Sequence, residues 1–133
     1  MPEPWPVPEL TAENAEFFSS GDIRLQHCSA CGHVQHPPVP ICGSCQESEF
    51  DYRPGSRTGT IESFTVVHHP VHPMLVDRVP YNVVVVALDE PEGIRIVGNL
   101  LAEKGRSIGI GLRVSATCAE VDALLLPQWE VLD

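Results

Sequence analysis

The stretch CSACGHVQHPPVPICGSC, residues 28–45, contains four of the five cysteines of this 133-residue chain. They lie at Cys28, Cys31, Cys42 and Cys45, with the spacing C-x2-C-x10-C-x2-C. A gap of two residues lets both sulfurs of a pair point into one turn, and two such turns complete a tetrahedral metal site. Because four thiolates leave no position for water or substrate, the pattern predicts one structural metal ion.

Zinc is the expected metal, and iron in a rubredoxin-like site is the alternative. The same four thiolates bind either ion, so the spacing does not separate them. Zinc is favoured because few aromatic residues lie near the cysteines to shield a redox centre. His27 and His33 flank the cysteines and are expected outside the ligand set, beside it or on the surface. Gly32 and Gly43 are expected to adopt positive φ angles in the two turns.

The segment before the cysteines predicts an extended arm and one short helix. Prolines at positions 2, 4, 6 and 8 disfavour helix and regular sheet. Trp5 lies among them, either in a frayed terminus or as an anchor on a partner or on the rest of the chain. Thr11 is the expected N-cap of a helix over residues 12–19, and Gly21 is the expected left-handed C-cap. The apolar stripe of this helix would consist of Leu10, Ala15, Phe17 and Phe18.

The segment after the cysteines predicts five short strands, over residues 58–68, 81–88, 94–100, 112–118 and 124–129. The second is apolar throughout, as expected of a strand covered on both faces. Cys118 falls on the apolar face of the fourth strand and is expected to be a buried, inert thiol. Five strands without a long helical insertion favour a closed OB-fold barrel, with an SH3-like barrel as the alternative.

The predicted fold class is therefore mainly β, in three parts. Residues 1–21 form the proline-rich arm and short helix, residues 22–52 the rubredoxin-like zinc ribbon, and residues 53–133 the five-stranded OB-fold barrel. The ribbon has almost no apolar residues of its own, which is typical of a fold that depends on metal ligation.

Composition argues against two classes of partner. The chain has 8 Lys and Arg against 18 Asp and Glu, a formal charge of -10. Nucleic acid is not an expected partner, because binding a phosphate backbone requires many cations. The N-terminus lacks the basic start and apolar core of a secretory signal, and the longest apolar stretch, residues 83–88, is too short to span a bilayer. We therefore expect a cytoplasmic protein that does not enter a membrane.

The sequence shows no set of residues typical of catalysis. We find no Ser-His-Asp arrangement, no phosphate-binding glycine loop and no redox C-x-x-C pair beyond the metal pairs. The most polar cluster is His68, His69 and His72, in a proline-rich loop after the first barrel strand. Histidines there could transfer protons. No carboxylate lies close in sequence to orient an imidazole, so the preferred interpretation is an interface or pocket wall.

Three segments together resemble a known family. They are the pattern Pro-x-Leu-Thr-x-Glu-Asn-x-x-Phe-Phe over residues 8–18, the run RLQHCSACG over residues 24–32, and GTIESFTVVH over residues 59–68. Their order and spacing resemble the acyl-CoA-associated OB-fold proteins with an N-terminal rubredoxin-like zinc ribbon. The resemblance implies an accessory subunit that binds and stabilises a thiolase-fold partner, such as a sterol-carrier-protein thiolase-like enzyme or a steroid-CoA aldolase.

In such a complex the catalytic residues would belong to the partner. The implied reaction is retro-aldol or thiolytic cleavage of a carbon–carbon bond in an acyl-CoA thioester, during breakdown of steroid or fatty-acid-like side chains. If this subunit contacts the anionic CoA, its few cations must gather locally. The candidates are Arg53, Arg57, Lys104 and Arg106, and ordinary surface charge is the alternative for each.

Two other functions compete with this interpretation. Zinc ribbons and OB-folds both occur in nucleic-acid-binding modules, although only 6% of the residues here are aromatic and the charge is unfavourable. A rubredoxin-like electron carrier would use the same four cysteines with iron.

Overall fold

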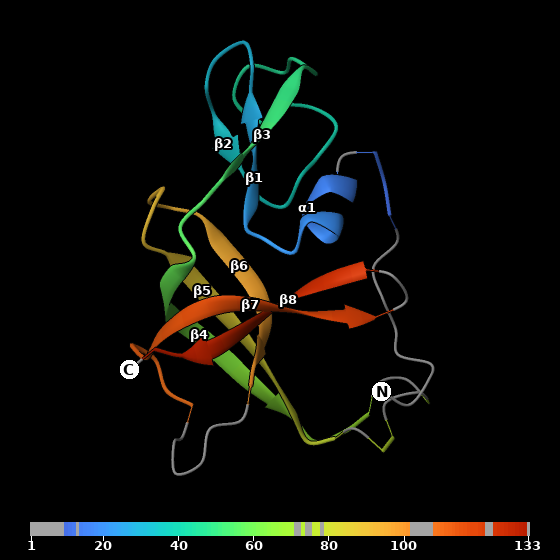
Figure 1. Ribbon diagram of the computed structural model, residues 1–133, viewed down its shortest axis with the longest axis vertical. Helices are drawn as coiled ribbons and strands as arrows, with labels where there is room; N and C mark the ends of the chain where they lie inside the picture. Colours follow the sequence, from blue (N-terminus) through green and yellow to red (C-terminus); the bar gives the residue numbers. More distant parts are fainter. Residues whose placement is uncertain are drawn as a thin grey trace.

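The computed structural model describes residues 10–12, 14–70, 73, 76–77, 79–101, 108–121 and 124–132. Figure 1 shows a small sheet with one short helix beside it, placed above a barrel that contains most of the remaining chain. The chain is mostly strand, as the sequence predicts. Within the described residues, no helix has the length and apolar character needed to cross a membrane.

The helix α1 covers Ala15–Ser20, so it begins three residues later than predicted. Asn14 directly precedes the helix, but Thr11 makes the capping contact that the sequence predicts: its hydroxyl accepts the Asn14 N–H at 3.2 Å, and the Thr11 N–H donates to Asn14 Oδ1 at 2.8 Å. Gly21 adopts φ 70°, which confirms the left-handed C-cap. Phe17 is buried, as the expected stripe requires, whereas Leu10 is 51% exposed and does not belong to the stripe.

The ribbon sheet has the order β2-β1-β3, with β1 at Arg24–Cys28, β2 at Val34–Gln35 and β3 at Phe50–Pro54. A fully buried Gln26 lies at its centre. The Gln26 amide nitrogen donates to the Val39 carbonyl at 2.8 Å, and its amide oxygen accepts from Gln35 Nε2 at 2.8 Å. A buried amide must be hydrogen-bonded, so Gln26 fixes the loop between the cysteine pairs to the sheet.

The barrel contains all five predicted strands. They are β4 at Thr58–Val67, β5 at Tyr81–Leu88, β6 at Arg95–Leu100, β7 at Arg113–Val121 and β8 at Leu124–Val131. The closed order is β4-β5-β6-β8-β7, with β6 and β8 parallel and every other pair antiparallel. This is the five-stranded OB-fold and not the SH3-like alternative.

Two details of the predicted strands are wrong. In β5, Val84, Val86 and Leu88 are buried and the alternate residues are only half-buried, so one face of this strand is covered more fully than the other. Cys118 is exposed rather than buried. Both errors have the same cause: an apolar residue on a strand does not by itself show which face of the strand the rest of the fold covers.

Ribbon and barrel share one hydrophobic core. Phe17 of α1, Leu25 of β1, and Ile61 and Trp129 of the barrel belong to the same buried cluster. Within the barrel, β6 and β8 approach closely at Gly98, where an added Cβ would lie 2.7 Å from the Pro127 carbonyl oxygen and 3.1 Å from the Trp129 ring. The ribbon and the barrel therefore pack as one body.

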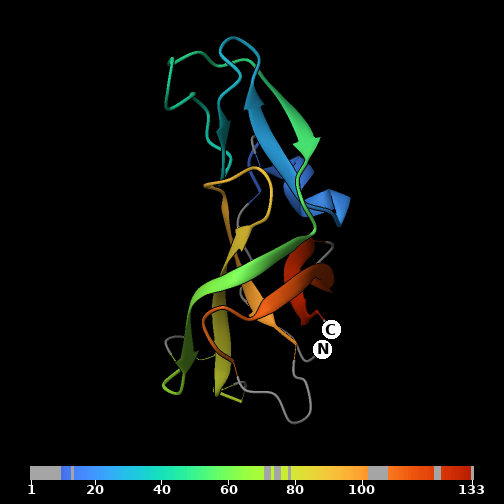
Figure 2. The same ribbon diagram turned by 90° about the vertical axis from the view of Figure 1, so that its left-hand side faces the viewer.

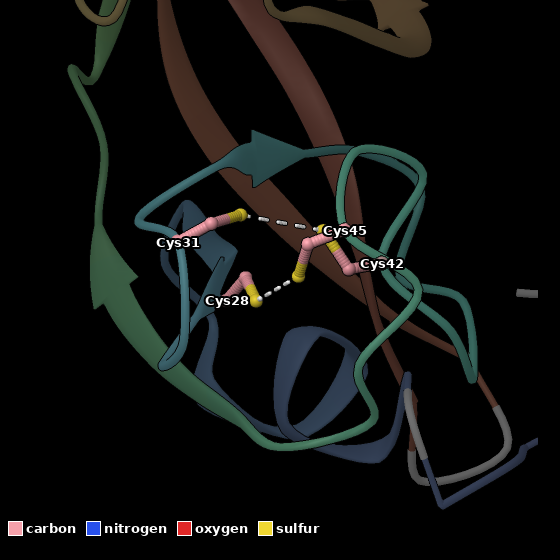
Figure 3. A group of neighbouring side chains, drawn as sticks. All are labelled: Cys28, Cys31, Cys42 and Cys45. Atoms are coloured by element: carbon pink, nitrogen blue, oxygen red, sulfur yellow. Dashed lines mark hydrogen bonds between the residues drawn. The ribbon is translucent and has the colours of Figure 1, made fainter.

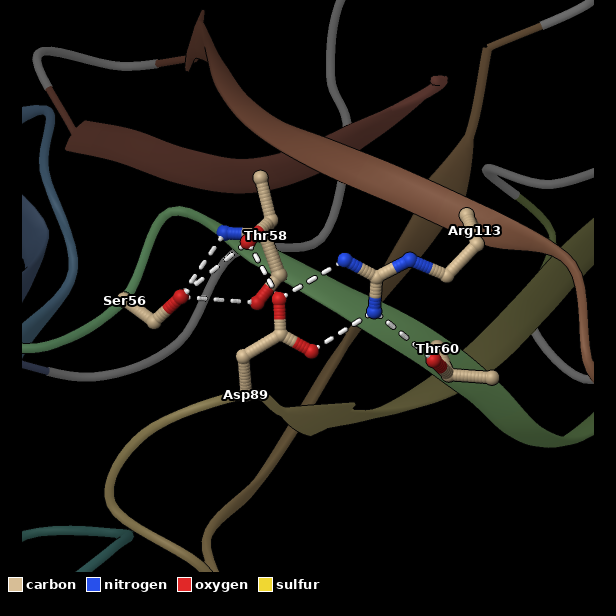
Figure 4. A network of polar contacts seen from close by, with 5 residues as sticks. All are labelled: Ser56, Thr58, Thr60, Asp89 and Arg113. Atoms are coloured by element: carbon tan, nitrogen blue, oxygen red, sulfur yellow. Dashed lines mark hydrogen bonds and ion pairs between the residues drawn. The ribbon is translucent and has the colours of Figure 1, made fainter. Parts of the chain in front are cut away.

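A polar network holds the start of β4 in place (Figure 4). Asp89 accepts two hydrogen bonds from Arg113, at 2.6 and 2.8 Å, and one from the Thr58 hydroxyl at 2.5 Å. Hydrogen bonds from Arg113 and Thr58 lower the pKa of Asp89 to about 2. The network joins β4, the β5–β6 turn and β7 where the chain enters the barrel.

Candidate metal centre

The two cysteine pairs lie in turns with the same backbone pattern. In the first turn the Gly32 N–H donates to the Cys28 carbonyl at 2.9 Å, and in the second the Gln46 N–H donates to the Cys42 carbonyl at 3.0 Å. Gly32 has φ 80°, as predicted, and Gln46 has φ 68°. Gly43 does not have a positive φ, so that expectation is wrong. The left-handed residue follows the second cysteine of each pair, and only the first turn has glycine there.

The four sulfurs gather at one point (Figure 3). Cys28 Sγ lies 3.5 Å from Cys45 Sγ, and Cys31 Sγ lies 3.7 Å from Cys42 Sγ. All four sulfurs are within 4.8 Å of one another. Metal–sulfur bonds of about 2.3 Å in a tetrahedron place neighbouring sulfurs about 3.8 Å apart. The cluster therefore fits a four-coordinate metal ion, and the sulfurs come from two turns that the fold already brings together.

The surroundings favour thiolate at Cys42. Its sulfur accepts the Ser44 N–H at 3.3 Å. Backbone N–H groups, first that of Cys45 and also that of Ser44, lower the pKa of the Cys42 thiol to about 6 against the opposing effect of burial. Although the Glu47 backbone N–H lowers it, burial and hydrogen bonds with the other three cysteines raise the pKa of the Cys45 thiol to about 12. The backbone donors therefore favour thiolate at Cys42, whereas Cys45 becomes a ligand only when it loses its proton on binding a metal ion. The first cysteine of each pair, Cys28 and Cys42, is buried, whereas Cys31 is exposed and Cys45 is half-buried.

Neither flanking histidine belongs to the ligand cluster, which consists of the four cysteines. His33 is exposed, and its carbonyl accepts the Cys28 N–H at 2.9 Å. His27 is half-buried, and its pKa is lowered by burial and by nearby Arg53, against the opposite effect of Asp51. Both positions agree with the interpretation of these residues as neighbours or surface groups.

Sequence reasoning missed the contact that supports the second turn. Gln35 Oε1 accepts the Gly43 N–H at 3.1 Å, while Gln35 Nε2 donates to Gln26. The two glutamines thus connect the second cysteine turn to the ribbon sheet. No motif reveals such a pair, because glutamine in a short polar segment ordinarily indicates a solvated surface.

The predicted CoA and interface residues are distributed over several regions. Arg53 pairs with Asp51 on its own strand at 3.0 Å. Arg57 pairs with Asp22 and donates to the Ala116 carbonyl at 2.9 Å, so it connects the segment before β1 to the barrel. His68 and His69 are exposed just after β4. The other predicted residues, Trp5, His72, Lys104 and Arg106, lie outside the described residues.

A cavity of about 480 Å³ lies where α1, the ribbon loop and the barrel meet. Its walls include Phe17, Phe18, Pro37 and Val97. His36 also lines it, with its ring centroid 4.8 Å from that of Phe17. The His36 Nδ1 is buried without a hydrogen-bond partner, and burial lowers the pKa of this ring to about 4. The sequence does not reveal this cavity, because its walls come from three separate segments.

Comparison with known proteins gives matches over both parts of the chain. Residues 17–51 match the rubredoxin-like zinc ribbon domain of ChsH2, and residues 52–118 match the ChsH2 C-terminal OB-fold domain. A probable enoyl-CoA hydratase alpha subunit from Thermomonospora curvata is 36% identical over 92% of this chain. The 3-oxo-4,17-pregnadiene-20-carboxyl-CoA hydratase alpha subunit from Mycobacterium tuberculosis is 32% identical over 90% of it.

The chain spans only 38% of the length of each of these two relatives. Among solved structures it is similar to a chain of the Ltp2-ChsH2(DUF35) aldolase, with a TM-score of 0.79 and 34% identity. That similarity covers 94% of this chain and 98% of the aldolase chain. These matches confirm the family resemblance predicted from the motifs.

Proposed function

Because the chain belongs to the ChsH2 family, which joins a rubredoxin-like zinc ribbon to an OB-fold domain, we propose that it is an accessory subunit of an enzyme complex acting on acyl-CoA thioesters. The observation that supports this most strongly is the similarity to the Ltp2-ChsH2(DUF35) aldolase chain over 98% of that chain's length. The names of the two hydratase alpha subunits agree with a role in acyl-CoA chemistry.

The proposed partner is a thiolase-fold subunit that supplies the catalytic residues. In the complex, this chain stabilises the partner, and the reaction is retro-aldol or thiolytic carbon–carbon cleavage of a steroid or fatty-acid-like acyl-CoA. The architecture supports a binding role. Ribbon and barrel share one core, so they present a rigid surface, and no histidine is hydrogen-bonded to a carboxylate within the described residues.

The metal in this proposal is structural zinc. Its ligands are Cys28, Cys31, Cys42 and Cys45, which fill all four positions of a tetrahedron. The ion would supply folding free energy to a ribbon that has few apolar residues. Iron fits the same sulfurs, and a rubredoxin-like electron carrier would then be coloured. A visible spectrum and a metal analysis of protein from its native source separate the two.

CoA contacts are proposed for exposed cations of this chain. Arg53 lines a groove of about 700 Å³ together with Ser56, Pro91 and the acidic Glu90. Its guanidinium makes two hydrogen bonds to the carboxylate of Asp51 on the same strand, whereas Arg57 is bound to both Asp22 and the Ala116 carbonyl of the barrel. Arg53 is therefore the better placed of the two for an incoming phosphate. Lys104 and Arg106 remain proposed on the basis of sequence.

Co-expression tests the proposal. The chain is produced with and without thiolase-fold proteins encoded in the same genome, and complexes are detected by size-exclusion chromatography with light scattering. Cleavage of acyl-CoA thioesters is then measured for each component alone and for the complex. We expect a stable hetero-oligomer, and activity only when the partner is present. Robust cleavage by this chain alone, or the absence of any complex, would contradict the proposal.

A further inference from the structure

Among the segments that the structure describes, strand β4 has partners on both sides only along its first half. Thr58 to Thr60 pair with β7, and Ile61 exchanges hydrogen bonds with the Gly111–Leu112 turn. Beyond a register shift between Ile61 and Ser63, β4 pairs with β5 as far as Val67. No described segment pairs with the other edge of β4 there, and Figure 2 shows this part of the strand at the margin of the barrel.

The register identifies the backbone groups on this edge. The Leu88 N–H donates to the Ile94 carbonyl, so Leu88 faces β6. Backbone groups alternate along an antiparallel strand, so Val83 and Val85 of β5 face β4. Their partners in the register are Thr65 and Ser63, which therefore face β5. The N–H and C=O groups of Phe64 and Val66 consequently point to the free edge.

The side chains on this segment favour pairing over solvation. Phe64 and Val66 are each 40% exposed. The run Ser63-Phe64-Thr65-Val66-Val67 is rich in β-branched and aromatic residues, and it contains none of the lysines or prolines that commonly protect exposed edges. An edge with these properties is a template for another strand.

We propose that the free edge of β4 at Phe64 and Val66 binds an extended strand from the partner subunit. This inference rests on the proposed function as an accessory subunit. The occupant is an apolar, β-rich segment flanked by Lys or Arg, because this chain has a formal charge of -10. Charge also disfavours a second copy of the chain, which would bring two strongly acidic molecules together. Main-chain hydrogen bonds give affinity, and the alternating side chains give specificity.

Two variants of the full chain separate backbone pairing from side-chain contact. Val66→Pro removes the N–H that points outward, and proline is tolerated on an edge strand where the missing donor faces solvent. Val66→Thr, the matched control, keeps the N–H and the β-propensity. The far-UV circular dichroism and melting temperature of both variants are compared with those of the wild-type chain. The first probe is a synthetic peptide in which alternating Val and Thr are flanked by Lys pairs.

Amide exchange measured by NMR is the readout. With the peptide, we expect exchange at Phe64 and Val66 to slow by about tenfold or more, because new backbone hydrogen bonds protect these amides. Val66→Pro should weaken peptide binding by about tenfold, and Val66→Thr by much less. Absence of peptide binding, or binding without protection of these two amides, would overturn the inference. Self-association of the wild-type chain that Val66→Pro abolishes would also overturn it.

The second probe is the thiolase-fold subunit from the co-expression experiment. If the wild-type complex forms and Val66→Pro assembles with the same affinity, the strand-pairing inference fails while the proposed function stands. If the wild-type chain forms no complex, the proposed function fails, and strand pairing at the β4 edge is then tested by the peptide experiment alone. Loss of assembly in Val66→Pro, but not in Val66→Thr, supports both.

Discussion

Replacing His36 with leucine tests how the junction between ribbon and barrel responds to pH. The half-buried His36 packs its ring against Phe17, its buried Nδ1 has no hydrogen-bond partner, and burial lowers its pKa from 6.5 to about 4. Above the higher value the ring is neutral in both the folded and the unfolded chain. As the pH falls from 6.5 towards 4, the unfolded chain binds a proton that the folded chain does not, so the free energy of unfolding decreases.

The size of the effect follows from the shift. One pKa unit corresponds to about 1.4 kcal/mol, so the full shift is worth about 3 kcal/mol once the pH is below both values. Between about pH 7.5 and about pH 5 the expected loss from His36 is about 2 kcal/mol. A loss of about 2 kcal/mol is a large part of the free energy of unfolding of a small domain.

Urea unfolding, followed by circular dichroism at a series of pH values, measures the effect. His36→Leu should lose less stability than the wild-type chain on acidification, by about 2 kcal/mol at about pH 5. Metal release also depends on pH, but it affects both proteins and cancels in the difference. His69→Gln, at an exposed position, is the control and should follow the wild type. Parallel losses in wild type and His36→Leu would refute the reasoning.

Four other substitutions test separate parts of the structure. Cys45→Ser should abolish binding of one equivalent of metal, measured by elemental analysis, and lower the melting temperature; unchanged metal content would contradict the site. Gln46 and Gly32 both have positive φ, which glycine adopts more readily than other residues. Gln46→Gly should therefore raise the free energy of unfolding by about 0.5 kcal/mol. Gly32→Ala should lower it by about 1 kcal/mol through the backbone conformation alone, since an added Cβ at Gly32 meets no atom within 4 Å. The ionised Asp89 carboxylate stabilises the folded chain, because its pKa there is lowered to about 2, and this stabilisation is lost as the carboxylate is protonated between about pH 4 and 2. Asp89→Asn should therefore lose less stability than the wild-type chain over this pH range, measured by urea unfolding. Equal acid sensitivity in both proteins would contradict this.

Local chemistry made much of the fold predictable from sequence. Four cysteines at fixed spacing specify one tetrahedral cluster whatever surrounds them, and the structure brings these sulfurs together. The β-rich composition from Thr58 onward, which predicts a strand, and the glycine at position 21 likewise act within a few residues. Each of these predictions depends on short-range geometry, and each is confirmed.

Most of the failures depend on contacts between distant segments. Cys118 has an apolar side chain on a strand, but only the packed barrel decides that it is exposed. The burial of Gln26 and the cavity at His36 likewise arise only when ribbon, helix and barrel meet. The error at Gly43 is instead local: the Gln46 N–H donates to the Cys42 carbonyl within the turn, and the positive φ falls at Gln46, after the second cysteine.

The position of the ribbon gives the metal a role beyond its own turns. The loop between the cysteine pairs places His36 and Pro37 in the wall of the cavity, which Val97 of the barrel also lines. Gln26 ties this loop to the ribbon sheet, and Leu25 of the same strand lies in the core with Trp129. Because these contacts form one continuous packed unit, an ion that closes the two cysteine turns also fixes the surface where ribbon and barrel meet. That surface is separate from the β4 edge, which lies on the barrel alone, so metal ligation and strand pairing would contribute to partner binding through different parts of the molecule.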